Sequence, residues 1–246
     1  MSKSNPIIEI KNLKKSYGSN CVLNGFNMFL NEGENLVIMG KSGSGKSVMI
    51  KCLIGLEEAD SGTITVMGQE ISQLNQGKLD ELRTEVGFLF QGSALYDSMT
   101  VRENLEFPLR RHTKKFGYIK DTSPLVMEAL NNVGLGHTVD LMPEELSGGM
   151  KRRVALARTL ILQPKIILYD EPTTGLDPIT AKEILLLMKS IQEKYNTSAI
   201  IITHDVDCAR VISNRMILLV DGINYAEGTF EELSESSDTK IQAFFK

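Results

Sequence analysis

Apolar residues near the start of the chain alternate with polar ones, which is the pattern of strands that bury one face. Within residues 7–38, the alternating apolar positions are Ile8, Ile10, Phe26, Met28 and Leu30. A further short strand is expected at Gly62–Gly68, where glycines bound the run. Together these segments predict a small antiparallel subdomain.

Elsewhere the apolar residues form short continuous runs, as expected for strands buried on both faces of a parallel sheet. These runs are Leu36–Met39, Val86–Phe90, Ile166–Tyr169, Ala199–Thr203 and Met216–Val220. Helical patterns separate them, which predicts an α/β fold with a doubly wound parallel core. Asp221-Gly222 predicts a hairpin turn after the last run.

Between Gln91 and Gln163 the pattern becomes helical, which predicts a helical subdomain at about residues 92–162. It would be inserted into a core of about residues 1–91 and 163–246, all within a single domain, residues 1–246. Capping signals predict three helix starts, at Thr100 with Glu103, at Ser147, and at Asp177 with Pro178. The last of these helices should run through Tyr195.

The amino-acid composition of the chain limits the classes of protein to which it can belong. The 246 residues carry a net charge of −4, so no basic surface for nucleic acid is expected. The longest apolar runs are too short to span a membrane, and the N-terminus lacks an apolar signal region. Three scattered cysteines suit free thiols in a reducing cytosol. A transport role would therefore require separate membrane subunits.

The most informative segment is a glycine-rich loop between an apolar run and a helical pattern. It matches G-x-x-x-x-G-K-[ST] and consists of Gly40, Lys41, Ser42, Gly43, Ser44, Gly45, Lys46 and Ser47, followed by Val48. Glycines let backbone N–H groups approach phosphates, and the helix start adds its positive dipole end. Lys46 would reach the β- and γ-phosphates of ATP, and the Ser47 hydroxyl would ligate Mg²⁺.

Four further strings follow in order. They are Phe90-Gln91-Gly92, Glu145–Arg153 with Ser147-Gly148-Gly149 inside it, Ile166–Pro172 with Gly175–Pro178 after it, and Ile201–Asp205. Together with the phosphate loop, this set resembles the nucleotide-binding subunit of ATP-binding-cassette (ABC) transporters over essentially the whole chain. The resemblance implies ATP and Mg²⁺ as cofactors and ATP hydrolysis coupled to transport.

Asp170 and Glu171 end a buried apolar run, where an unpaired carboxylate would be unfavourable. Asp170 is expected to hold the hydration shell of Mg²⁺, and Glu171 to orient or deprotonate the attacking water. Gln91 ends its own strand and could accept from that water or reach Mg²⁺. His204, after the run Ala199–Thr203, is placed to hydrogen-bond the γ-phosphate.

Tyr17 could stack on adenine, as an aromatic does at that place in the family, and Val22 is a weaker candidate for the same pocket. Ser147, Gly148 and Gly149 open a helix whose first turn carries Lys151, Arg152 and Arg153, against the helix dipole. Either Glu144 and Glu145 offset these cations, or the helix end awaits an external anion.

In the family, this signature touches the γ-phosphate bound to the partner subunit. The resemblance therefore implies a head-to-tail homodimer with Asp177 at the seam. Met150 stands where the family usually has Gln, which leaves side-chain coupling from that position open.

Several loops and the C-terminal tail make the resemblance more specific: these segments resemble the ATPase of Mla-type phospholipid transporters. The segments are Phe90–Val101, Asn104–Arg110, Met150 and Ser236–Phe245. This implies an integral membrane permease, an MCE-domain lipid-binding protein, and a position on the cytoplasmic face of the inner membrane. Leu95–Arg111 lies where relatives meet the permease, so Tyr96, Met99 and Phe107 are candidate contacts. The tail would cover its own domain, or pack on the second ATPase or a small regulatory protein.

Two alternatives stay open at this level. A polar amino-acid importer shares the general cassette. A soluble ABC ATPase of DNA repair or ribosomes is disfavoured, because the chain lacks a long coiled coil and a second cassette. A small-molecule kinase would explain the phosphate loop but not the Ser147-Gly148-Gly149 string.

Overall fold

The alternating residues near the N-terminus form an antiparallel sheet. The computed structural model describes residues 6–112, 115, 117 and 119–245, and the strand order of this sheet is β2-β1-β4-β5. The strands are β1 (Ile8–Tyr17), β2 (Asn20–Leu30), β4 (Ser61–Val66) and β5 (Gln69–Glu70). The five alternating apolar side chains are all buried, which confirms the expected sheet.

A six-stranded sheet occupies the centre of the fold, with the order β10-β9-β3-β8-β7-β6. All neighbours run parallel except β10, which pairs with β9 in the antiparallel sense across the expected Asp221-Gly222 turn. The strands are β3 (Asn35–Met39), β6 (Val86–Leu89), β7 (Ile166–Asp170), β8 (Ser198–Thr203), β9 (Arg215–Val220) and β10 (Ile223–Gly228). The predicted doubly wound parallel core is confirmed.

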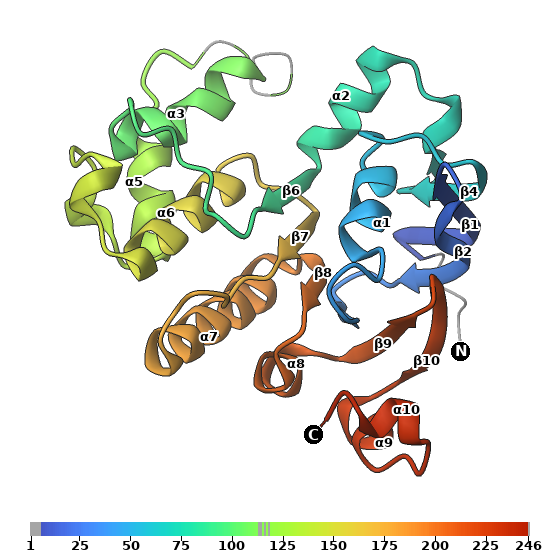
Figure 1. Cartoon of the computed structure of the whole chain (residues 1–246). Coiled ribbons are helices and arrows are strands. Elements are labelled where there is room, and N and C mark those ends of the chain that lie inside the picture. The colour runs from blue at the N-terminus through green and yellow to red at the C-terminus, as the bar shows by residue number, and fades with distance from the viewer. Residues whose placement is uncertain (1–5, 113–114, 116, 118, 246) are drawn as a thin grey trace.

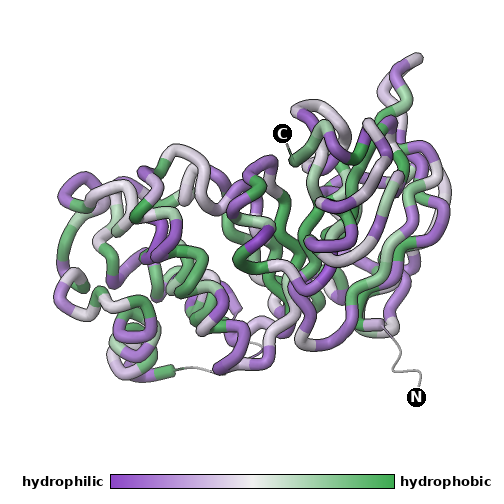
Figure 2. Tube along the Cα trace, turned by 90° about the horizontal axis from the view of Figure 1, so that it is seen from below, coloured by the Kyte–Doolittle hydropathy of each residue, from purple (hydrophilic) through white to green (hydrophobic). Residues whose placement is uncertain are grey.

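Strand β3 shows why this sheet must be covered on both faces. Val37 and Met39 belong to one hydrophobic cluster, which the larger helices cover. Leu36 and Ile38 belong to a second cluster, shared with the antiparallel sheet and α1. Figure 2 shows hydrophobic stretches gathered toward the interior of the fold, with hydrophilic residues mostly toward the outside.

Helices flank the central sheet (Figure 1). They are α1 (Lys46–Leu53), α2 (Gln76–Thr84), α7 (Pro178–Tyr195) and α8 (Val206–Ile212). Helix α7 begins and ends where the sequence predicts, with the Asp177 carboxylate accepting from the backbone N–H groups of Ile179 and Thr180. None of the helices in the described ranges is both long and apolar enough to span a membrane.

Between β6 and β7 the chain is mainly helical and lies to one side of the two sheets (Figure 1). Its main helices are α3 (Val101–Arg111), α5 (Ser123–Asn132) and α6 (Gly148–Leu160). Thr100 and Glu103 form the predicted capping box at the start of α3. The Ser147 hydroxyl caps α6 by accepting from the N–H of Met150 at 3.2 Å.

The C-terminal residues pack on their own chain, through α9 (Phe230–Ser234) and α10 (Thr239–Gln242). Ile241 is buried, and the Phe245 ring meets the Phe230 ring edge-on at 5.5 Å between centroids. The Tyr225 hydroxyl donates to the Asp238 carboxylate at 2.8 Å. Of the placements expected for the tail, the structure shows the one in which the tail covers its own domain.

Candidate functional site

The glycine-rich loop connects the end of β3 to the start of α1. Gly43 and Gly45 adopt φ values of 78° and 103°, which favour glycine. A Cβ on Gly40 would collide with the Ser44 hydroxyl and would lie 2.9 Å from the Leu219 carbonyl oxygen. The buried Ser44 hydroxyl has no hydrogen-bond partner among the described residues. This tight, glycine-dependent turn before a helix fits a phosphate cradle.

Lys46 places a buried ammonium inside this loop, with the residue only 8 % exposed. Its Nζ donates to the carbonyl oxygens of Gly40 at 2.7 Å and Lys41 at 3.1 Å. Burial lowers the pKa of Lys46, and the nearby carboxylates of Glu171 and Asp170 oppose that shift. Ser47 follows in the first turn of α1 and is exposed, whereas Val48 is half-buried against the core.

Glu171 and His204 meet at the carboxyl ends of neighbouring strands. His204 Nδ1 lies 2.9 Å from a Glu171 carboxylate oxygen, and the Thr174 hydroxyl donates to that carboxylate at 3.2 Å. Glu171 has a φ of 51°, a left-handed value that is uncommon for a residue with a side chain. Its N–H donates to the Ile202 carbonyl at 2.9 Å, which holds this backbone in place.

Asp170 is the last residue of β7 and lies beside Lys46 and Glu171. Burial raises the pKa of Asp170, the Glu171 charge raises it further, and the Lys46 charge opposes both. No three His, Cys, Asp or Glu side chains in the described part of the chain converge on a metal position. Mg²⁺ commonly uses one or two protein ligands together with phosphates and water, so this finding does not contradict Ser47 and Asp170 as the expected ligands.

The raised pKa of Asp170 predicts a stability change for Asp170→Asn. Above the ordinary pKa of aspartate the unfolded chain releases this proton more readily than the folded one, so folding stability is lost as pH rises. We expect the variant to melt above wild type at pH 7 without nucleotide or metal, by about 2–4 °C for each kcal/mol recovered. Thermal unfolding at a series of pH values should show this difference in melting temperature shrink as the pH falls toward 4.

Asp121→Asn is the matched control, because hydrogen bonds from Ser123 lower the pKa of Asp121 instead. Its melting temperature should not rise at pH 7. An Asp170→Asn variant that melts below wild type at pH 7 would contradict the prediction.

The main chain at Gln91 is held by the helix that Ser147 caps. Arg152 donates to the carbonyl oxygen of Phe90 at 2.6 Å and also to that of Gln91. The Gln91 side chain is exposed and makes no hydrogen bond within the described ranges. Its expected contact with water or Mg²⁺ stays a prediction.

Two of the three cations expected to oppose the dipole of α6, Arg152 and Arg153, have hydrogen-bond partners within the chain. Arg152 is 3 % exposed and bonded to main-chain carbonyls, and Arg153 pairs with Glu183 at 2.7 Å. Among the described residues neither Glu144 nor Glu145 forms an ion pair with these cations, and the Glu145 carboxylate accepts from the Met142 N–H at 2.6 Å. The sequence pattern missed both partners because they lie far away along the chain.

Gly149, in the first turn of α6, packs against the start of α7. A Cβ on Gly149 would lie 2.7 Å from Thr180 Cγ2, so this approach requires glycine. Asp177 caps the neighbouring helix, and its hydrogen bonds from Thr180 lower its pKa. The signature glycines and Asp177, both predicted for the subunit seam, therefore lie together. The phosphate loop lies elsewhere, because it follows β3, and β8 separates β3 from β7.

Tyr17 and Val22 differ in their position relative to the loop. Tyr17 is exposed, and its hydroxyl donates to the Glu57 carboxylate. Val22 contacts the loop closely, since a Cβ on Gly45 would lie 3.0 Å from Val22 Cγ1. Val22 also lines a cavity of about 690 Å³ beside the loop.

The tail contributes to that cavity, which sequence reasoning missed. Thr239, Lys240, Ala243 and Phe244 line it opposite loop residues Lys41 to Ser44. Nothing in the local pattern of the tail indicates which distant loop it will face.

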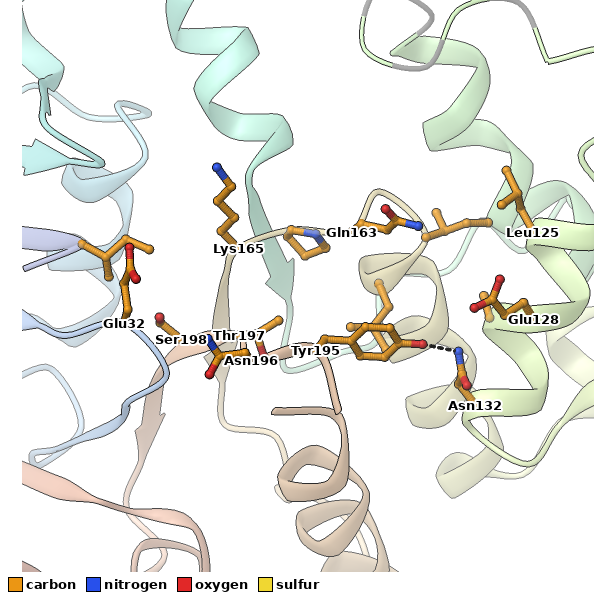
Figure 3. A pocket seen from close by; sticks show the side chains of 15 residues that line it. Glu32, Leu125, Glu128, Asn132, Gln163, Lys165, Tyr195, Asn196, Thr197 and Ser198 are labelled. Atoms are coloured by element: carbon orange, nitrogen blue, oxygen red, sulfur yellow. Dashed lines mark hydrogen bonds between the residues drawn. The ribbon is translucent and has the colours of Figure 1, made fainter. Parts of the chain in front are cut away.

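A second cavity, of about 550 Å³, lies at the other edge of the central sheet (Figure 3). Its lining includes Lys165 and Ser198, at the amino ends of β7 and β8, and Glu128 and Asn132 of α5. The Asn132 amide donates to the Tyr195 hydroxyl across it at 2.6 Å. The phosphate loop, Gln91, Asp170, Glu171 and His204 lie at the carboxyl ends of the parallel strands, so this cavity is separate from them.

Comparison with known proteins decides the family. The family model described as ABC transporter matches residues 23–174. The chain belongs to the ABC transporter family. It is therefore an ABC ATPase subunit, which binds ATP with Mg²⁺ and hydrolyses it.

Two curated relatives are 38 % identical to this chain. The methionine import ATP-binding protein MetN of Campylobacter jejuni matches over 97 % of this chain and 75 % of its own length. The intermembrane phospholipid transport system ATP-binding protein MlaF of Haemophilus influenzae matches over 98 % of this chain and 90 % of its own length.

Among solved structures, a dimeric post-hydrolysis state of the ATP-binding cassette MJ0796 bound to ADP and Pi has a TM-score of 0.81. It is 33 % identical, and the match covers 91 % of this chain and 98 % of that one. An ABC ATPase fold and an Mla-like member among the relatives agree with the resemblance inferred from the motifs.

Proposed function

We propose that this ABC ATPase powers phospholipid transport across or between bacterial envelope membranes. The observation that carries the proposal is the match to MlaF, which extends over 90 % of that protein as well as 98 % of this chain. The equally identical MetN leaves a quarter of its own length unmatched. The Mla-like loops and tail add support from the sequence.

The proposed site sits at the carboxyl edge of the parallel strands, in the core of about residues 1–91 and 163–246. Lys46 would neutralise the β- and γ-phosphates, with the backbone of residues 40–45 around them. Ser47 and Asp170 would hold Mg²⁺, which stabilises developing negative charge on the phosphates. Gln91 and His204 would orient the water and the γ-phosphate, and Tyr17 the adenine.

Glu171 is the proposed general base. Its carboxylate lies 2.9 Å from His204 and accepts from Thr174, so its orientation is fixed before substrate arrives. A base fixed in this way removes part of the ordering that hydrolysis otherwise requires. The left-handed backbone at Glu171 suits a functional position, because such strain persists only where the surrounding structure enforces it.

Two copies would pair head to tail, with Ser147, Gly148, Gly149 and Asp177 of each copy facing the phosphate loop of the other. The dimeric MJ0796 cassette supports this arrangement. Ile179, two residues after Asp177, is 75 % exposed, as a large apolar side chain at a subunit seam would be in a single chain.

Docking onto an integral membrane permease would hold the ATPase at the cytoplasmic face of the inner membrane. Tyr96 and Phe107 are both exposed, and their rings lie 4.9 Å apart between centroids. An exposed aromatic pair of this kind is a typical anchor for a partner. An MCE-domain protein, and a small regulatory protein, would complete the assembly.

Purification of the assembly from bacterial membranes tests the proposal. The chain should co-purify with its permease and with phospholipid identified by mass spectrometry, and its deletion should make the envelope leakier to detergent. Tyr96→Ala should lower its affinity for the permease by about tenfold or more. Leu186→Ala, which alters an exposed apolar residue on α7, should not.

An amino-acid permease in the same purification, with unchanged envelope integrity, would contradict the lipid proposal. In that case the chain would power an importer of the kind to which MetN belongs.

A further inference from the structure

A buried arginine joins the signature helix α6 to the segment that carries Gln91. Arg152 lies in the second turn of α6, after Ser147, Gly148 and Gly149. Its guanidinium donates to the carbonyl oxygen of Phe90 at 2.6 Å and to that of Gln91. One planar side chain thus spans two successive peptide groups of the loop after β6.

Arg152 has no negatively charged partner in the described part of the chain. It forms no ion pair there, its Nε has no hydrogen bond, and burial lowers the pKa of its guanidinium. Burying an unpaired charge is unfavourable, and apolar replacements of similar volume are often neutral or stabilising. What offsets this unfavourable burial is the pair of hydrogen bonds to the loop after β6, so the side chain ties α6 to that loop.

A second arginine of α6 holds the next part of the same segment. Arg158 donates to the carbonyl oxygens of Ala94 at 2.8 Å and Ser93 at 3.1 Å. Ser93 and Ala94 have φ values of 62° and 48°, both left-handed. Such conformations persist where the surroundings enforce them. The segment from Phe90 to Ala94 is therefore fixed to α6 at both ends.

We propose that Arg152 is a positioning residue for ATP hydrolysis, which fixes the main chain at Gln91 to α6. Gln91 and the Ser147-Gly148-Gly149 signature then move as one unit. The signature can reach the partner's nucleotide only when α6 is correctly placed, so the same placement delivers Gln91 to its own site. This inference rests on the proposed roles of Gln91 and the signature.

A double-mutant cycle tests the coupling. Arg152→Met keeps the length of the side chain and removes its charge and its donors. We expect the hydrolysis rate of the purified ATPase to fall by about tenfold to a hundredfold, because small misplacements of reacting groups are that harmful. The KM for ATP should change less than about twofold, since the phosphate loop is untouched. Combined with Gln91→Ala, Arg152→Met should lower the rate no further than Gln91→Ala does alone.

Three further measurements separate positioning from a structural role. The melting temperature of Arg152→Met should stay within about 4 °C of wild type, or rise, because the variant removes a buried charge. Arg152→Lys should recover part of the rate, since it retains one cationic donor. Arg210→Met, which removes an exposed arginine of α8 paired with Asp207, should hydrolyse ATP at nearly the wild-type rate.

The outcomes distinguish this inference from the roles on which it rests. Wild-type hydrolysis by Gln91→Ala would refute the proposed role of Gln91, and with it the reason for positioning it. A slow Gln91→Ala variant beside an active Arg152→Met variant would refute only the positioning by Arg152. Multiplicative effects in the double variant, or a large loss of melting temperature in Arg152→Met, would also refute it.

Discussion

Glu171→Gln is expected to lower the rate of ATP hydrolysis by about a hundredfold or more while ATP binding is retained. The amide can still meet His204 and Thr174, which contact the carboxylate at 2.9 and 3.2 Å. It cannot take a proton from the attacking water. Steady-state phosphate release and equilibrium binding of labelled ATP measure the two effects separately.

The same variant tests the head-to-tail dimer. With product formation blocked, ATP should hold two copies together, so size-exclusion chromatography should show a dimer in ATP and a monomer without it. Adding Ser147→Arg should abolish the dimer, because the bulky charge would stand where the partner's nucleotide is expected. Glu235→Gln, an exposed carboxylate on the tail, is the control and should behave as wild type. Wild-type hydrolysis by Glu171→Gln would remove Glu171 from the mechanism.

The fold was predictable from the sequence to the extent that its signals are local. Alternation in β1 and β2, and continuous apolar runs in the parallel strands, follow from the number of faces each strand buries. The caps at Thr100, Ser147 and Asp177 depend on side chains within three residues of the helix starts. Each of these features needs only its own stretch of chain.

The nucleotide site was predictable in its components, because the phosphate loop requires glycines and a Lys-Ser pair at fixed spacing. The structure adds the contacts between distant segments. Glu171 meets His204 because β7 and β8 are parallel neighbours, and their register brings Asp170 opposite Ile202. Such pairing is set by the whole sheet.

The missed features depend on long-range contacts in the same way. In the sequence Arg152 is one of three neighbouring cations, but in the structure it is buried against carbonyl groups of the loop after β6. The sequence predicts that the Tyr17 ring stacks on adenine, but it gives no sign that the Tyr17 hydroxyl donates to Glu57. Lys240 and its neighbours line the cavity beside the phosphate loop, although nothing in the tail itself indicates that position.

Lys46→Ala is expected to weaken ATP binding by about tenfold to a hundredfold and to stop turnover, since a hydrogen bond to a charged group contributes about 1.5–3 kcal/mol. In the loop, Lys46 Nζ lies between the carbonyl oxygens of Gly40 and Lys41. Removing it leaves those carbonyls and the phosphates without their cation. Equilibrium titration with labelled ATP measures the loss.

The control for Lys46→Ala is Lys51→Ala, which removes an exposed lysine of the same helix that pairs with Glu57. That variant should bind ATP as wild type does.

Thermal unfolding separates an effect on ATP binding from an effect on folding. Lys46→Ala removes a buried charge but also its hydrogen bonds to two carbonyls, and these effects oppose each other, so the variant should melt within about 4 °C of wild type without nucleotide. Unchanged affinity together with an unchanged rate in Lys46→Ala would mean that this loop does not hold the phosphates. Weaker binding with an unchanged melting temperature would locate the phosphates at Lys46, on the same edge of the sheet as Asp170, Glu171 and His204.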